Sequence, residues 1–213
     1  MTAPPCFDDA FLAGLRELMN WRRDVRRFKR EPVPRPLIDE MLGLAQLSPS
    51  VGNSQPWRLV EVASEPMRAA VKANFRACNA AALAAQAPSR ADDYARLKLE
   101  GLDAAPTQFA VFCDRGTQQG HGLGALTMPE TLDYSVVSMI AMLWLAARAR
   151  GLGLGWVSIL DPARMVADLG LPASYKFIAY LCLGFPEGEH DTPELERAGW
   201  QARTPIGAYI LHV

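Results

Sequence analysis

Hydrophobic and polar positions repeat at helical spacing in several long stretches of the chain. In the first stretch, apolar residues stand three and four apart from residue 7 to about 23, and a proline-rich break at 32–36 precedes the next. Asp161 followed by Pro162 places a capping residue before a proline in the first helical turn. The pattern predicts helices over 7–23, 37–46, 64–87, 92–100 and 134–150, and a short helix that begins at Pro162.

Between these helices lie short runs rich in β-branched and aromatic residues. They predict strands over 58–62, 108–113, 155–160 and 177–183, and the apolar tail over 206–213 is a further strand that could pair with another chain. Strands that alternate with helices indicate a single α/β (α+β) domain over residues 1–213. The run Gly151-Leu-Gly-Leu-Gly155 lacks the spacing of a dinucleotide-binding loop, so we expect a helix end that turns into a strand.

Composition and charge exclude several classes of function. Half of the 213 residues are hydrophobic and the net charge is -1, which allows a sizeable core and argues against nucleic-acid binding. The four cysteines and three histidines are scattered, so we expect neither a metal site nor a disulfide framework. The apolar stretch 134–150 is shorter than the roughly 20 residues that cross a bilayer, and the N-terminus is unlike a signal peptide. A cytoplasmic protein without a membrane segment is expected.

Two polar segments are candidates for a ligand site. Six arginines and lysines stand between Arg22 and Arg30, and Arg22 and Arg26 would share a face if that stretch were helical. Two guanidiniums on one face can bind a phosphate, although a run of charge is more often a solvated face. The second segment, Asn53-Ser-Gln55, is either an ordinary turn or a row of amides for a flavin edge. Together the segments favour an anionic ligand rich in hydrogen-bonding groups, such as a flavin phosphate.

The spacing of these residues resembles a known signature. Arg22-x-Asp24-x-Arg26, followed by Pro49-Ser-x-x-Asn53-x-Gln55-Pro-Trp57, is similar to the FMN-binding signature of the nitroreductase family. That family usually has a serine where this chain has Asp24. Longer matches, among them Arg22-Arg-Asp-Val-Arg26 and Gly155-Trp-Val-Ser-Ile159, resemble one branch of the family, in which reduced FMN is consumed.

The resemblance implies a nitroreductase-like fold, with a central, mostly antiparallel sheet flanked by helices. It implies a homodimer with FMN at the interface, a domain-swapped C-terminal arm at about 200–213 and a lid at about 88–105. Arg22, Arg26 and Arg203 would hold the phosphate. The other residues that the resemblance places at the flavin are Arg23, Asp24, Val25, Ser50, Asn53, Gln55, Leu99 and Ser158.

In that branch, O2 and reduced FMN give 5,6-dimethylbenzimidazole, the lower ligand of vitamin B12, and D-erythrose 4-phosphate. Asp24 would act as the general base at the ribityl chain, and Ser158 would relay a proton or hold the flavin near N5. A separate flavin reductase would supply reduced FMN. Two alternatives remain at this point, an NAD(P)H-dependent nitroreductase or flavin reductase on the same fold and a flavin-binding protein without catalysis.

Overall fold

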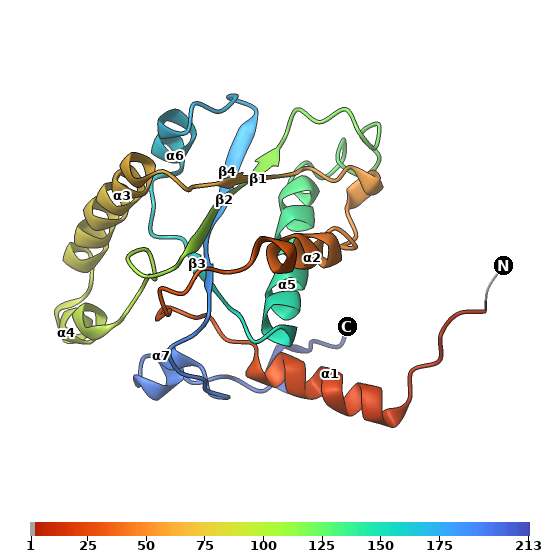
Figure 1. Ribbon diagram of the computed structural model, residues 1–213, viewed down its shortest axis with the longest axis horizontal. Helices are drawn as coiled ribbons and strands as arrows, with labels where there is room; N and C mark the ends of the chain where they lie inside the picture. The colour runs from red at the N-terminus through yellow and green to blue at the C-terminus, as the bar shows by residue number, and fades with distance from the viewer. Residues whose placement is uncertain (1–2) are drawn as a thin grey trace.

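A four-stranded antiparallel sheet forms the centre of the computed structural model, which describes residues 3–213 (Figure 1). The strand order is β1-β2-β4-β3, and each neighbouring pair runs antiparallel. The strands are β1 (Trp57–Glu61), β2 (Thr107–Asp114), β3 (Gly153–Val157) and β4 (Tyr175–Gly184). A mixed helix and strand domain with a mostly antiparallel sheet is therefore confirmed.

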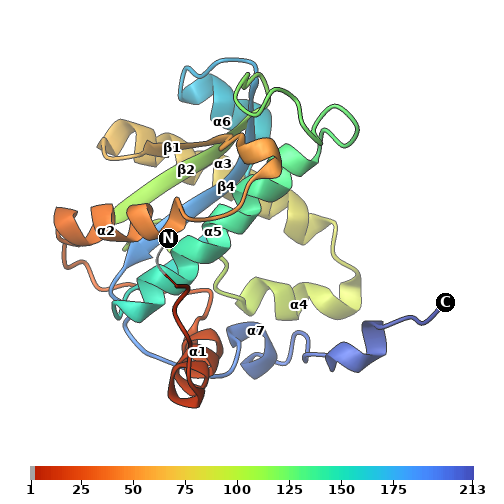
Figure 2. The same ribbon diagram turned by 90° about the vertical axis from the view of Figure 1, so that its right-hand side faces the viewer.

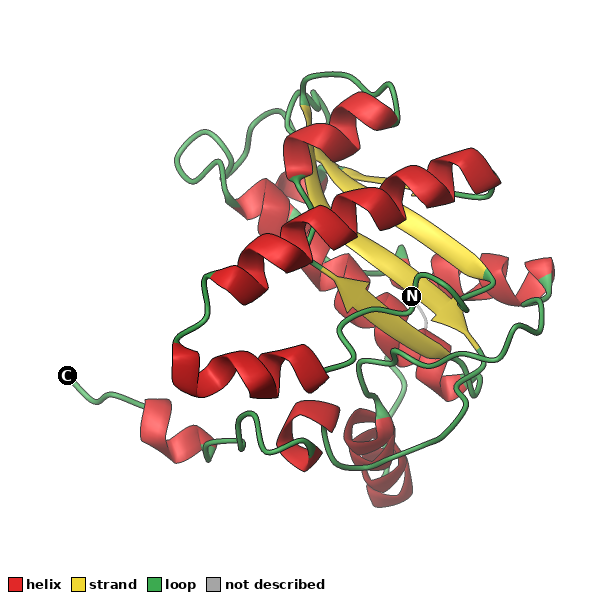
Figure 3. Ribbon diagram, turned by 90° about the vertical axis from the view of Figure 1, so that its left-hand side faces the viewer, coloured by secondary structure: helices red, strands yellow, loops and turns green. Residues whose placement is uncertain are grey.

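Helices cover both faces of this sheet. Figure 2 shows α2 (Arg35–Ala45) and α5 (Thr131–Ala149) in front of one face, and Figure 3 shows α3 (Glu65–Ala84) and α6 (Pro162–Asp168) over the other. The remaining helical segments lie toward the edges: α1 (Asp9–Trp21), α4 (Pro88–Arg96), α7 (Glu194–Arg197) and the 3₁₀ turns η1 (Val51–Asn53) and η2 (Ile206–Tyr209). The Asp161 cap is confirmed, because its side chain accepts from the backbone N–H groups of Ala163 and Arg164.

The core has two parts because side chains alternate across the sheet. On β2, Val111 and Cys113 face the cluster with α2 and α5, whereas Ala110 and Phe112 face the cluster with α3 and α6. Both central strands are therefore apolar on both faces. Helix α5 is long and apolar enough to cross a bilayer, but half of its apolar window is buried against this core. That burial is expected of the central helix of a folded domain.

Three predicted elements differ from the observed ones. The helix predicted over 92–100 begins at Pro88 and ends at Arg96, because Leu97 takes an extended conformation. The strand predicted over 155–160 runs instead from Gly153 to Val157. In the single chain, the tail predicted as a strand over 206–213 forms a 3₁₀ turn and pairs with none of the described strands, and its pairing with another chain stays a prediction. A strand needs a hydrogen-bonding neighbour, and the described part of this chain offers none to the tail.

Candidate functional site

The segment from Arg22 to Arg26 is extended and lies against the edge strand β3. Helix α1 ends at Trp21, Arg22 has φ -70° and ψ 115°, and the N–H of Val25 donates to the carbonyl of Leu154 across 3.1 Å. The stretch is therefore not helical, and Arg22 and Arg26 do not share a helical face. Because side chains alternate in an extended segment, Arg22, Asp24 and Arg26 share one side through a spacing of two.

Two glycines of β3 make this contact possible. A Cβ on Gly155 would lie 2.1 Å from the carbonyl oxygen of Val25, and one on Gly153 would lie 2.7 Å from the Val25 side chain. Any larger residue at Gly155 would therefore displace the segment. Gly151, with φ +71°, follows the end of α5. The glycine run is thus a helix end that turns into a strand, as predicted, and it also seats the site segment.

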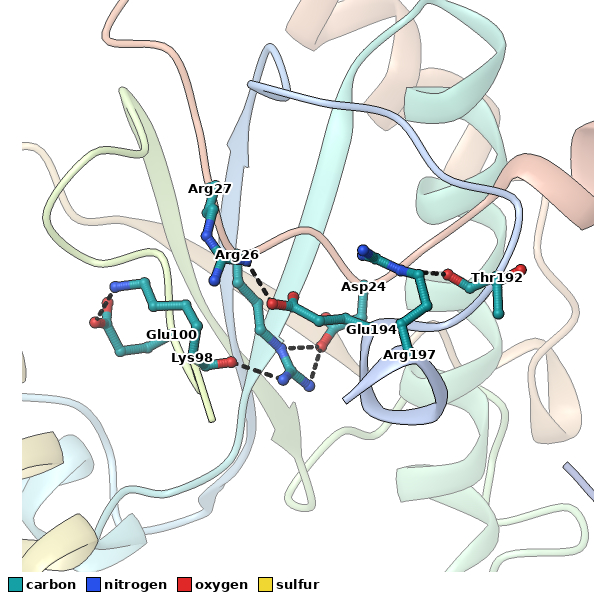
Figure 4. A network of polar contacts seen from close by, with 8 residues as sticks. All are labelled: Asp24, Arg26, Arg27, Lys98, Glu100, Thr192, Glu194 and Arg197. Carbon is teal, nitrogen blue, oxygen red and sulfur yellow. Dashed lines mark hydrogen bonds and ion pairs between the residues drawn. The ribbon is translucent and has the colours of Figure 1, made fainter. Parts of the chain in front are cut away.

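The carboxylate of Asp24 is held at both oxygens. Its Oδ1 accepts from the backbone N–H of Trp156 at 2.8 Å, and its Oδ2 lies 3.0 Å from Nε and 2.9 Å from Nη2 of Arg26 (Figure 4). Burial raises the pKa of Asp24, while the charge of Arg26 and the Trp156 N–H oppose that shift. A fixed carboxylate of raised pKa is suited to act as a general base.

Three guanidiniums gather beside this carboxylate. Arg22 lies over the ring of Trp144, 4.9 Å from its centroid, and the indole N–H of Trp144 donates to the carbonyl of Arg23 at 3.0 Å. Burial lowers the pKa of both Arg22 and Arg23, and the positive charge of Arg203 lowers each further. The Nε of Arg23 is buried and has no hydrogen-bond partner among the described residues. Three guanidiniums at one pocket favour the binding of an anion.

Six of the predicted residues meet at one pocket of about 330 Å³. They are Arg22, Arg23, Asp24, Arg26, Ser158 and Arg203, joined by Trp144 and Trp156. Ser158 is exposed just beyond the end of β3, where it faces this pocket. A neighbouring hollow of about 450 Å³ shares the segment 22–26, including Val25, and is closed on its other side by the segment 186–197. The Arg-Asp-Arg signature therefore lies between two connected hollows.

The amide loop predicted for the flavin has a strained backbone. Asn53 and Gln55 have φ of 56° and 43°, the left-handed region that costs energy for residues other than glycine. The hydroxyl of Ser50 accepts from the N–H of Gln55 at 3.1 Å, and the side chain of Gln119 donates to the carbonyl of Asn53 at 2.8 Å. The turn is thus held in place from both sides, with its amide side chains at the surface.

This loop lies at the opposite end of the sheet from Asp24. Trp57, which follows the loop, pairs with Cys113 of β2, whereas Trp156 lies in the row of Leu181 and Phe109. Four residues along a strand and three strand spacings across the sheet separate Trp57 from Trp156 by roughly 20 Å. Within one chain, the predicted site residues therefore form two separate groups.

Leu99 belongs to neither group. It is partly buried against the cluster of α3 and α6 and lines neither hollow. Its neighbour is closer to the site, because Nη1 of Arg26 donates to the carbonyl of Lys98 at 2.7 Å (Figure 4). Neither this contact nor the place of Trp144 at the site is predicted by the sequence pattern. A tryptophan within the most apolar helix looks like a core residue, and a backbone carbonyl carries no sequence signal.

Comparison with known proteins identifies the family. The model of the nitroreductase family matches residues 19–185. The chain is 57% identical to a protein of Rhodospirillum rubrum named 5,6-dimethylbenzimidazole synthase. The 205 aligned residues cover 96% of this chain and 97% of that protein. A protein of the same name from Rhodobacter capsulatus is 48% identical over 199 residues, which cover 93% of this chain and 96% of that protein.

A solved structure supports the fold. Iodotyrosine deiodinase, crystallised with FMN and 3-iodo-L-tyrosine, superimposes with a TM-score of 0.68 over 83% of this chain and 91% of the other, at 24% identity. The chain belongs to the nitroreductase family. Within that family it is similar over nearly its whole length to proteins named 5,6-dimethylbenzimidazole synthase, so the branch resemblance seen in the sequence is confirmed.

Proposed function

We propose that the chain fragments reduced FMN with O2 to give 5,6-dimethylbenzimidazole and D-erythrose 4-phosphate. The names of its relatives support this activity. The observation that carries it is the position of Asp24, a carboxylate held by Trp156 and Arg26 beside three guanidiniums. Ordinary members of the family have a hydroxyl residue at this place, which is a much weaker base near neutral pH.

The arginine cluster supplies the binding site for the FMN phosphate. Arg22 and Arg203 line the pocket of Asp24, and their mutual repulsion falls when a dianion lies between them. Arg23 lines the same pocket and adds a third guanidinium to it. Charge-assisted hydrogen bonds of this kind would fix the phosphate end of the substrate and so place its ribityl chain beside Asp24.

Asp24 and Ser158 share the proton transfers. In the reaction the ribityl C1′–C2′ bond breaks: the dimethylbenzene ring of the flavin, its two nitrogens and C1′ become the benzimidazole, and the remaining four ribityl carbons leave as the sugar phosphate. Asp24 takes a proton from the ribityl carbon or hydroxyl. Ser158, exposed beyond β3 at the same pocket, relays a proton or holds the ring.

The working unit is a homodimer in which the amide loop of one chain completes the pocket of the other. One flavin ring is too short to bridge the roughly 20 Å that separates Trp57, next to the amide loop, from Trp156, next to Asp24. Helix α1 has no buried residue in the single chain although one face is apolar, which favours a partner surface. The large exposed apolar residues in and just before α1 and in the tail are Phe7, Phe11, Leu12, Met19, Trp21, Ile206, Tyr209, Ile210, Leu211 and Val213.

The segment around 88–105 acts as a lid that limits the access of bulk water, which favours fragmentation over loss of the electrons to O2 as H2O2. Leu99 approaches the ring when the lid closes. A separate flavin reductase supplies reduced FMN, and the reaction takes place in the cytoplasm.

The test is to mix the protein with chemically reduced FMN without oxygen, admit air, and analyse the products by mass spectrometry. A benzimidazole with a four-carbon sugar phosphate is the expected result. Oxidised FMN and H2O2 as sole products, with protein in excess, would contradict the proposal. Steady NAD(P)H oxidation with the flavin intact would then identify a nitroreductase or flavin reductase, and intact flavin without turnover a flavin-binding protein.

A further inference from the structure

We infer that Arg26 is a positioning residue that ties the Asp24 carboxylate to the lid tip, residues 97–100, so that carboxylate orientation and lid closure depend on each other. The inference rests on the proposed function, because it concerns the base and lid of that reaction. It differs from the sequence-based expectation, in which Arg26 holds the phosphate.

The guanidinium of Arg26 is largely committed inside the protein. Its side chain is 12% exposed, Nε and Nη2 both contact Oδ2 of Asp24, and Nη1 donates to the carbonyl of Lys98. A guanidinium has five N–H donors in a rigid fork, and three of those of Arg26 point at these two partners. Arg203 contrasts with it, because its side chain is exposed at the rim of the pocket.

Two contacts hold the lid tip: Leu99 packs against the cluster of α3 and α6, and Arg26 donates to the carbonyl of Lys98, whereas the chain from Leu102 onward is anchored separately. The side chain of Gln108 donates to the carbonyls of Leu102 and Ala105 at 3.0 and 3.1 Å, and the hydroxyl of Tyr180 holds Gln108 at 2.7 Å. These groups fix the chain from Leu102 onward on β2 and β4. Between the end of α4 and this anchor, the Arg26–Lys98 bond joins the tip to the site segment.

The same arginine sets the rotation of the Asp24 carboxylate. The N–H of Trp156 holds only Oδ1, so a carboxylate without Arg26 could turn about that bond. A catalytic group must be held within about 0.5 Å and roughly 10–20° of its working geometry. The rigid guanidinium of Arg26 contacts both Oδ2 of Asp24 and the carbonyl of Lys98 in the lid. The orientation of the Asp24 carboxylate therefore depends on the position of the lid.

Arg26→Lys separates this role from phosphate binding. A lysine keeps the positive charge but cannot hold Asp24 and the Lys98 carbonyl with a planar fork. Arg27→Lys is the matched control. Arg27 is the next residue in the chain after Arg26, but it pairs with Glu194 and does not contact Asp24. Thermal unfolding of each variant checks that it is folded.

We expect three results for Arg26→Lys. Benzimidazole formed per reduced FMN consumed falls by roughly tenfold or more, as small misplacements of a catalytic group cost rates of this order. Amide hydrogen exchange at 97–101 speeds up, and the preference for FMN over riboflavin in binding is unchanged. Arg27→Lys changes none of the three.

Two outcomes would overturn the inference. One is loss of the FMN preference to the extent seen for Arg203→Ala, which would make Arg26 a phosphate anchor. The other is unchanged amide exchange at 97–101, which would separate Arg26 from the lid. Exchange and binding are measured without turnover, so they decide the inference even if the wild-type protein forms no benzimidazole.

Discussion

The backbone N–H of Trp156 in β3 donates to the carboxylate of Asp24 across 2.8 Å, and this bond fixes a candidate base to the edge of the central sheet. Asp24 lies in an extended segment that would otherwise have few partners. The bond therefore links an element of the core to the carboxylate of the candidate site. It also defines the first variant to make.

Asp24→Asn should abolish product formation while reduced FMN still binds. An asparagine oxygen can still accept from Trp156, but an amide cannot take up a proton as a carboxylate does. General bases contribute roughly 10²- to 10⁴-fold to rate, so we expect a loss of that size. Product yield by mass spectrometry and anaerobic titration with reduced FMN check this. Loss of binding with loss of product would make Asp24 a structural residue instead.

Arg203→Ala should weaken the binding of FMN more than that of riboflavin. Only FMN carries the phosphate, and a charge-assisted hydrogen bond contributes about 1.5–3 kcal/mol, or roughly 10- to 100-fold in affinity. Anaerobic binding of the two reduced flavins gives the ratio. Arg164→Ala, which removes a surface pair with Asp168, is the control and should leave the ratio unchanged. Equal weakening of both flavins would remove Arg203 from the phosphate site.

Mixed dimers should recover activity from two inactive variants. In a dimer of Asp24→Asn with Asn53→Ala chains, one pocket has both changes and the other has neither. Random exchange of equal amounts should restore about a quarter of wild-type activity, since half of the dimers are mixed and each has one intact site. Product yield is measured before and after exchange. If both groups acted within one chain, mixing would restore nothing.

Gly155→Ala should displace the segment 22–26 from β3. The new Cβ would lie 2.1 Å from the carbonyl oxygen of Val25, and overpacking of this kind costs about 1–3 kcal/mol. Both the free energy of unfolding and FMN binding should fall. Gly43→Ala in α2 is the matched control, because a Cβ there meets nothing within 4 Å and alanine favours a helix. Unchanged FMN binding in folded Gly155→Ala would show that the segment does not need this close approach.

Asp133→Asn should reduce stability in a pH-dependent way. Burial alone would raise the pKa of Asp133, but hydrogen bonds from Arg115 and Lys176 outweigh it and hold the pKa below 3.8. The stabilisation is thus present above the unfolded pKa and is lost as pH falls through the folded one. Both cations are over a third exposed, so screening limits the cost near neutral pH to about 1–2 kcal/mol.

Urea unfolding of wild type and Asp133→Asn over a descending pH series measures this difference. It should shrink as the medium approaches the folded pKa of Asp133. Asp168→Asn, at an exposed pair with Arg164, serves as the control with a cost of about 0.5 kcal/mol or less. A difference that stays constant with pH would show that the charge of Asp133 is not what stabilises the fold.

The sequence by itself determined the elements whose signals are local. Periodic apolar residues located α1, α2 and α5 to within a few residues, and Asp161 with Pro162 located the start of α6. The resemblance of Arg22-x-Asp24-x-Arg26 to a flavin-binding signature placed these residues at one site, whereas the helical face considered for Arg22 and Arg26 does not form. A spacing of two suits an extended segment, and only the position of β3 made this segment extended.

Tertiary structure decided the features that depend on residues far apart in the chain. Sequence spacing could not place the Asn53 loop at the opposite end of the sheet from Asp24, because strand order and register set that distance. Sequence spacing also could not reveal that the missing side chain of Gly155 leaves room for the carbonyl of Val25, or that Arg26 donates to the carbonyl of Lys98. These contacts join backbone atoms, which every residue type has, so no local pattern marks them.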